Sequence, residues 1–179
     1  MATIENLKGS QTEKNLQNAF AGESQARNRY SYYAAVAKSE GFGEIADFFE
    51  KTATNEMFHA KTWYKLIKGG KMPNVIECLE EAIAGENYEH TNMYPEFAAV
   101  AEKEGFDQIA SLFREIAKIE KSHEEQCKKV LESLKNSSYM LELANDTVCT
   151  ACGFDFRERD NLEVCPVCGR TAEYFAAKL

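Results

Sequence analysis

Apolar side chains recur every three to four residues from about residue 12 to about residue 135, which is the period of an amphipathic helix. Three glycine-containing breaks interrupt this period. The pattern therefore predicts four long helices, near residues 12–40, 43–68, 76–104 and 106–135. The connections within the first pair and within the second pair are short, so each pair should form an antiparallel hairpin.

The helical part contains an internal duplication. The octapeptide AVAKSEGF, which begins at Ala35, returns 64 residues later as AVAEKEGF, whereas the AGE that ends at Glu23 returns 63 residues later. One residue has therefore been inserted between Glu86 and Ala99 in the second copy. Helices commonly absorb such an insertion as a π-bulge, a feature that is frequent at functional sites. We expect a bulge in this interval, with Pro95 contributing to the distortion.

Composition and charge narrow the range of functions. Hydrophobic residues make up 44% of the chain and charged residues 28%, which is typical of a soluble globular protein. The net charge of −8 argues against nucleic acid or an anionic membrane as a partner. The N-terminal stretch MATIENLKGSQ lacks an apolar signal-peptide region, and no apolar run is long enough to cross a membrane. We therefore predict a cytoplasmic protein.

Glutamates and histidines stand at matching places in the two copies, one glutamate on the first helix and a Glu-x-x-His pair on the second. These residues are Glu23, Glu56 and His59 in the first copy and Glu86, Glu120 and His123 in the second. Residues three apart share a helix face, so each pair can present oxygen and nitrogen to one point. A single such pair is usually a solvated face, but its repetition beside apolar neighbours predicts a carboxylate-bridged dimetal site in a four-helix bundle.

Two tyrosines and the third histidine fall near this set. Tyr30 follows Glu23 by seven residues, and Tyr94 follows Glu86 by eight, which is about two helical turns in each case. Each phenol is either a packed core residue or a hydrogen-bond donor to a ligand carboxylate. His90 aligns with an arginine of the first copy, so we expect a polar edge position for it rather than a metal-binding one.

Four of the six cysteines lie close together near the C-terminus, in the sequences CTACG and CPVCG. They are Cys149, Cys152, Cys165 and Cys168. Two such C-x-x-C turns can surround one tetrahedral metal ion, either zinc or a single iron. Zinc would make the site structural, whereas iron would make it a one-electron carrier. The neighbouring dimetal site favours iron, because that site needs a supply of electrons.

In their order along the chain, these motifs resemble those of the rubrerythrin family over essentially the whole length. The helical part carries AGESQARNRY, two E-x-x-H motifs and the E-x-x-E of Glu86 and Glu89, and the tail carries paired cysteine knuckles. The resemblance implies an all-α four-helix ferritin-like bundle followed by a small β/loop rubredoxin-like domain. We expect the ferritin-like domain at 1–136, a linker at 137–146 and the four-cysteine rubredoxin-like domain at 147–179. Val148 departs from the aromatic residue that many family members have before the first knuckle.

The resemblance also implies a function, that of a non-haem diiron peroxidase. Such a protein reduces hydrogen peroxide to water in defence against oxidative stress. Electrons from NAD(P)H would arrive through a separate reductase, in some cases by way of a rubredoxin, and would pass through the iron of the four cysteines to the diiron site. The implied cofactors are two irons in the bundle and one iron in the four-cysteine site, where zinc is a possible substitute.

Roles for the ligands follow from the resemblance in the same way. Glu56 and Glu120 would bridge the two irons. Glu23 would be a terminal ligand on one iron, and Glu86 and His123 would be terminal ligands on the other.

The resemblance further implies that the first iron exchanges Glu89 for His59 between its oxidised and reduced states. Glu89 faces Ala26 in the other copy, so this choice of ligand would break the symmetry of the duplication. When released from iron, Glu89 is a candidate proton donor to peroxide. Tyr30 and Tyr94 match family tyrosines that lie beside the ligands.

The connection between the hairpins raises a question of assembly. Glu56 and Glu86 are 30 residues apart, and about 22 of these residues are predicted to be helical, covering about 33 Å in one direction. The remaining eight or so span at most about 27 Å, so a return along the bundle falls short. Fraying near Gly69 or a late helix start after Ile76 would lengthen the connection enough for the chain to return along the bundle. Otherwise two chains exchange hairpins, and we favour such a swapped homodimer with composite diiron sites.

Two other functions are compatible with parts of the pattern. A ferritin-like protein that oxidises and stores iron would use the bundle but would have no use for an electron-delivering tail. A zinc-stabilised regulatory protein would use the cysteines structurally. The combination of both motifs on one chain favours the peroxidase.

Overall fold

The computed structural model describes residues 4–136, 147–156 and 163–177. The chain divides into two compact units, Met1–Pro73 and Asn74–Leu179. Within the described ranges, no helix combines the length and the apolar composition that crossing a membrane requires.

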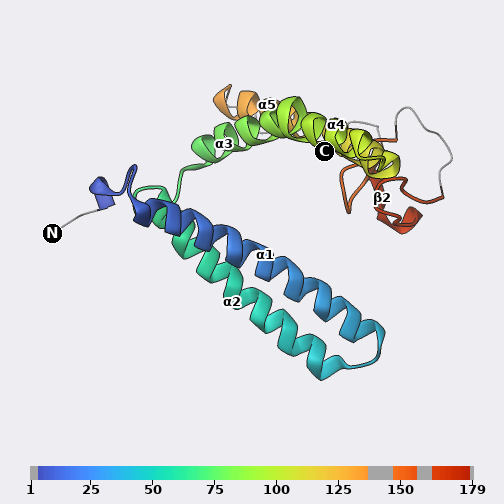
Figure 1. The fold of residues 1–179 in the computed structure, drawn as a ribbon, viewed down its shortest axis with the longest axis horizontal. Coiled ribbons are helices and arrows are strands. Elements are labelled where there is room, and N and C mark those ends of the chain that lie inside the picture. The colour runs from blue at the N-terminus through green and yellow to red at the C-terminus, as the bar shows by residue number, and fades with distance from the viewer. Residues whose placement is uncertain (1–3, 137–146, 157–162, 178–179) are drawn as a thin grey trace. The chain divides into compact units, whose positions relative to one another are not determined.

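The first unit is an antiparallel helical hairpin (Figure 1). A short 3-10 turn, η1 (Ile4–Asn6), precedes the long helices α1 (Gln11–Ser39) and α2 (Gly43–Ile67). The side chain of Ser10 caps α1 by accepting a hydrogen bond from the backbone N–H of Glu13 at 3.0 Å. Both helices agree closely with the sequence prediction.

The second unit begins with a second hairpin, in which one interrupted helix packs along α5 (Figure 1). Its elements are α3 (Val75–Tyr88), the π-helical turn η2 (Glu89–Met93), α4 (Tyr94–Lys103) and α5 (Asp107–Lys135). Asn74 and Glu77 form a capping box, with the Asn74 N–H donating to Glu77 Oε2 at 2.7 Å. This box fixes the start of α3 directly after the connection from the first unit.

The same turn closes both hairpins. Gly41 and Gly105 both have φ of +84°, a left-handed conformation that glycine adopts at helix ends. In each turn the phenylalanine that follows donates its N–H to the carbonyl five residues back, at 2.8 Å. The duplication seen in the sequence is thus a duplication of hairpin geometry.

The inserted residue of the second copy is absorbed by η2, as predicted. The N–H of Tyr94 donates to the carbonyl of Glu89, five residues back, which is the bond that defines a π-turn. Pro95 follows at the first turn of α4. Its missing N–H and its ring make a regular α-helical turn unfavourable here, so the widened turn suits this position.

Small side chains fill the contact between the helices of each hairpin. The buried residues there are Ala34, Ala37, Ala46, Ala53 and Ala60 in the first unit and Ala98, Ala101 and Ala110 in the second. Larger apolar side chains remain exposed, among them Phe48 and Phe58 in the first unit and Val100 and Ile109 in the second. Each hairpin therefore has an apolar face that its own two helices do not cover.

The C-terminal part contains an antiparallel pair of strands, β1 (Thr147–Cys149) and β2 (Phe175–Ala177), with the 3-10 turn η3 (Ala172–Tyr174) before β2. Its core is aromatic: the ring centroid of Phe156 lies 5.1 Å from that of Phe154 and 4.3 Å from that of Phe175. These rings fill the module although Val148 is not aromatic. The predicted linker at 137–146 lies outside the described residues, and the domain boundaries stay predictions.

Candidate metal centres

The first hairpin brings its three candidate ligands together. Nδ1 of His59 lies 2.9 Å from Oε2 of Glu56 and 3.7 Å from Oε2 of Glu23. One donor atom from each residue lies within 4.8 Å of the other two. Oxygen and nitrogen donors bound to one metal at about 2.1 Å stand about 3 Å apart, so this donor set fits a metal ion.

The second hairpin repeats this arrangement. Nδ1 of His123 lies 2.7 Å from Oε2 of Glu120 and 3.8 Å from Oε2 of Glu86, again within the same 4.8 Å limit. Burial, and then the neighbouring carboxylate of Glu120, raise the pKa of Glu86 above its usual range. A cation between these two carboxylates would relieve both effects, because it favours their charged forms.

Glu89 opens the π-turn and lies near the second triad without being part of it. Burial raises its pKa, and the charge of Glu86 raises it further. Its donor atoms are not among those that lie within 4.8 Å of one another. The structure therefore places Glu89 beside the triad, and its role as a ligand stays a prediction.

The two candidate tyrosines differ in their surroundings. Burial, followed by the charges of Glu120, Glu89 and Glu86, raises the pKa of Tyr94, which places this phenol in the field of the second triad. Both rings pack on aromatic neighbours: the centroid of Tyr30 lies 6.0 Å from that of Phe49, and the centroid of Tyr94 lies 6.0 Å from that of Phe113. The functional interpretation thus has more support for Tyr94 than for Tyr30.

The four C-terminal cysteines converge on one point. Sγ of Cys149 lies 3.6 Å from Sγ of Cys168, and Sγ of Cys152 lies 3.6 Å from Sγ of Cys165. These distances are too long for disulfides, and they match the sulfur separation of about 3.8 Å around a tetrahedral metal with bonds of about 2.3 Å. Burial raises the pKa of Cys152, a cost that a bound cation would remove. The donor set fits zinc or iron.

The four-cysteine module packs against α5 at the second triad. Ile119, one residue before Glu120, belongs to the same buried cluster as Cys149 and Cys165. A Cβ built on Gly153, directly after Cys152, would collide with Nε2 of His123. Since Nδ1 of the same ring faces the carboxylates of the triad, one imidazole connects the two candidate centres.

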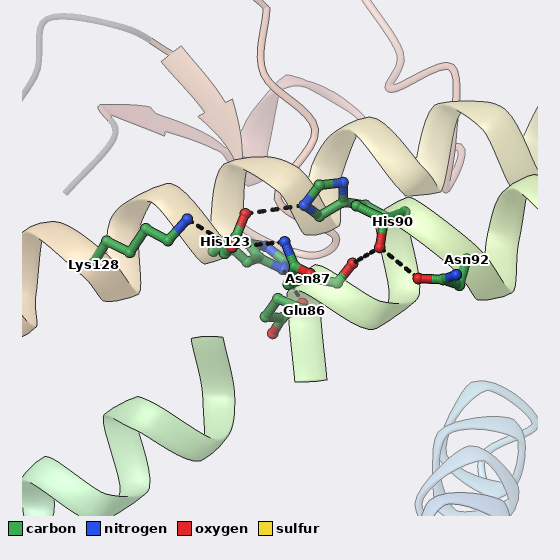
Figure 2. A network of polar contacts seen from close by, with 8 residues as sticks. Glu86, Asn87, His90, Asn92, His123 and Lys128 are labelled. Atoms are coloured by element: carbon green, nitrogen blue, oxygen red, sulfur yellow. Dashed lines mark hydrogen bonds and ion pairs between the residues drawn. The ribbon is translucent and has the colours of Figure 1, made fainter. Parts of the chain in front are cut away.

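A polar network beside the second triad has no counterpart among the sequence-based predictions. Glu124, only 5% exposed, accepts hydrogen bonds from Asn87 and His90 at 3.0 Å and from Lys128 at 2.7 Å (Figure 2). His90 has a polar position outside the candidate metal-binding groups, as expected, but its side chain is only 14% exposed and is paired with Glu124. The signal that could have found the network is the alignment of Glu124 with Ala60, a polar residue in place of an apolar one.

Comparisons with known proteins agree with these centres. The family model described as Rubrerythrin matches residues 14–131. The chain is 41% identical over 182 residues to a rubrerythrin of Porphyromonas gingivalis, covering 94% of this chain and 90% of the relative. It is 39% identical to a rubrerythrin of Nitratidesulfovibrio vulgaris and 38% identical to rubrerythrin-1 of Clostridium acetobutylicum, each alignment covering 96% of both chains.

These matches also confirm the predicted fold class, a helical ferritin-like part followed by a four-cysteine module that fits a rubredoxin-like site. The chain belongs to the rubrerythrin family of diiron oxidoreductases, which act in defence against oxidative stress.

Proposed function

We propose that the protein is a peroxidase that reduces hydrogen peroxide to water with electrons delivered through an iron held by the four cysteines. The observation that carries this proposal is the contact between Gly153 and His123, which brings the cysteine module onto a candidate ligand of the dimetal site. A storage protein would not need a one-electron carrier at this position.

The two triads and Glu89 would together hold a pair of irons. Glu56 and Glu120 would be the ligands shared by the two metals, Glu23 would hold the first, and Glu86 and His123 would hold the second. The close agreement between the two triads supports the near-symmetric part of this assignment. Glu89, present in one copy only, would alternate with His59 on the first iron.

When bound, an iron pair supplies two electrons for breaking the O–O bond of peroxide. Converting one hydrogen peroxide to two waters also consumes two protons. Glu89 is suited to deliver one of them when it is released from iron, because its carboxyl group lies beside the carboxylate of Glu86. The phenol of Tyr94 lies in the field of the same carboxylates and would orient the carboxylate nearest to it.

Electrons would enter at the cysteine module and leave it toward His123. Cys168 is exposed, whereas Cys149 and Cys165 are buried, so a donor protein can approach one side of the four-cysteine site. The donor would be a rubredoxin or an NAD(P)H-dependent reductase. A cytoplasmic location would suit such a donor and the pool of NAD(P)H.

We further propose that two chains exchange hairpins to complete the sites. Helix α2 ends at Ile67 and α3 begins at Val75, each within one residue of the predicted bounds. The connection between them is therefore no longer than predicted, and it remains too short for a return along the bundle. The exposed apolar side chains of each hairpin also need a covering surface, and the other hairpin of a second copy would supply it.

Complementation tests the exchange of hairpins. Glu56→Ala disables the first hairpin and Glu120→Ala disables the second, so each variant alone should be inactive. Co-expressed in a swapped dimer, the two variants generate one site with both defects and one intact site, and activity should return. No recovery in the mixed dimer would show that each chain completes its own site.

The peroxidase itself is tested with iron-loaded full-length protein reduced under anaerobic conditions. The colour of the iron bound by the four cysteines should bleach on reduction and return on mixing with peroxide, whereas Cys165→Ser should lose the colour but keep the dimetal iron. A colourless four-cysteine site holding zinc would overturn the electron path. Accumulation of ferric mineral, with slow reoxidation by peroxide, would favour the ferritin-like alternative.

A further inference from the structure

The residues around Glu124 are placed on both sides of Glu89. Asn87 lies in the last turn of α3, and His90 is the second residue of the π-turn, so the two flank Glu89 closely in sequence. Figure 2 shows Asn87, His90 and Lys128 converging from separate parts of the second hairpin. Their common partner, the Glu124 carboxylate, directly follows His123 on α5.

The Glu124 carboxylate is buried, so its stability depends on these hydrogen bonds. Among the described residues, Glu124 is the one charged side chain in the buried class. A buried carboxylate is tolerated only when hydrogen bonds and opposite charges compensate it. Asn87 and Lys128 donate to one oxygen of the Glu124 carboxylate and His90 donates to the other, so each oxygen has a partner. Displacing His90 or Asn87 from α5 would leave this charge poorly compensated.

A contact with α5 would stabilise the backbone of the π-turn. Its widened backbone replaces regular α-helical hydrogen bonds with longer-range ones, a conformation that is rare outside single turns at functional sites. The hydroxyl of Thr91 donates to the carbonyl of Asn87 at 2.6 Å, which ties the turn to the end of α3. This bond is local to the interrupted helix. Toward α5, the His90–Glu124 bond holds the start of the turn, whereas the ring of Tyr94, 6.0 Å from that of Phe113, packs at its end.

The first hairpin supplies an internal comparison. It has no insertion, and its counterpart of Glu124 is Ala60, which packs between the helices at 7% exposure. Ser24, the counterpart of Asn87, donates to the carbonyl of Phe20 within its own helix at 2.7 Å. The buried carboxylate therefore occurs in the copy that contains the π-turn and not in the copy with a regular helix.

We propose that Glu124 and His90 are positioning residues that clamp the π-turn to α5 and fix Glu89 relative to Glu120 and His123. The clamp acts through the backbone on either side of Glu89 and does not itself bind metal or substrate. Its relevance to turnover rests on the proposed peroxidase function, whereas its effect on the π-turn does not.

The decisive variants are His90→Leu, which removes the donor to Glu124, and His90→Gln, whose amide can restore it. Glu124→Ala is the companion that removes the acceptor. Glu102→Ala is the control, because it breaks an exposed ion pair with Arg114 in the same hairpin. Amide hydrogen exchange of residues 89–94 is measured on full-length protein with and without iron, together with the ferric absorption spectrum and the steady-state constants for peroxide.

We expect exchange at 89–94 to accelerate about tenfold in His90→Leu and Glu124→Ala, and to stay near wild type in His90→Gln and Glu102→Ala. In iron-loaded His90→Leu the ferric spectrum should shift and kcat should fall about tenfold, with KM changing less than about twofold. If Glu124→Ala does not fold, the His90 pair still decides the outcome.

Wild-type exchange and an unchanged ferric spectrum in His90→Leu would overturn the clamp. If the wild-type protein shows no peroxide turnover, the proposed function fails, and the exchange data still test the clamp alone. If turnover is present and His90→Leu matches wild type in every measurement, the clamp alone is wrong.

Discussion

The two hairpins of this chain are copies that have kept the same candidate metal ligands and diverged around them. Both close with the same glycine–phenylalanine turn, and both bring two glutamates to one histidine at nearly equal distances. A duplication is a direct way to build a two-metal site, because each copy contributes half of the ligands in the same geometry.

The differences are concentrated in the second hairpin. It alone has the π-turn with Glu89, the buried network around Glu124 and the contact between Gly153 and His123, as far as the described residues show. If the two triads hold a metal pair as proposed, this contrast would separate binding the metals from using them. The similar triads would serve the first task, whereas the additional features of the second hairpin would serve the second.

The greatest loss of activity should come from breaking the histidine symmetry. His123→Ala should lower peroxide turnover by more than about 100-fold, because it would remove both a proposed metal ligand and the contact with Gly153. Losing a residue that only hydrogen-bonds to a ligand typically costs about 10–100-fold. His59→Ala should lose less, because Glu89 would be an alternative ligand for the same iron in the proposed site. Iron content and kcat/KM measured side by side decide this, and equal losses would contradict the asymmetry.

Glu89→Ala removes the carboxylate that is unique to the second copy. The variant should keep its iron, because six other ligands remain, and should reduce peroxide about 100-fold more slowly through loss of a proton donor. Glu96→Ala, an exposed glutamate two turns further on, is the control. An unaffected rate in Glu89→Ala would reject both the exchange of ligands and the proton transfer.

Much of the contrast between the hairpins follows from the sequence. The 63- and 64-residue shifts predict the π-turn between Glu86 and Ala99, because an insertion inside a regular helix has few other solutions. The Glu-x-x-His spacing predicts the Glu–His pair of each triad, since residues three apart share a helix face. These features depend on local geometry, which the order of residues determines.

The features that the sequence does not predict depend on tertiary contacts. Glu124 stands in a run of polar and charged residues, KSHEEQ, which is typical of a solvated helix face. Its burial depends on contacts with the other helix of the hairpin, on which Asn87 and His90 lie. Gly153 belongs to a cysteine turn in which glycine is common, and the structure also requires it for contact with His123. Neither contact has a signature within one segment of the sequence.

A more moderate effect is expected at the contact between the cysteine module and the second hairpin. Gly153→Ala introduces a methyl group that collides with His123, so the module should shift and electron transfer to the dimetal site should slow at least about tenfold. Gly169→Ala is a matched control, because its φ of +71° imposes similar strain while its Cβ meets nothing within 4 Å. Stopped-flow reduction of the ferric site through the iron of the four cysteines measures both, and equal slowing would attribute the effect to backbone strain.

The mildest change concerns the pH dependence of stability of the metal-free protein. The pKa of Glu124 is about 2 in the folded state against 4.5 ordinarily, so its contribution to stability is present above about pH 4.5 and is lost as the pH falls toward 2. The difference in Tm between wild type and Glu124→Gln should therefore be largest near neutral pH and should shrink in acid. Glu102→Gln, at an exposed ion pair, should differ little from wild type throughout this range. A difference for Glu124→Gln that does not vary with pH would show that the charge of Glu124 does not stabilise the second hairpin, which would remove one of its contrasts with the first.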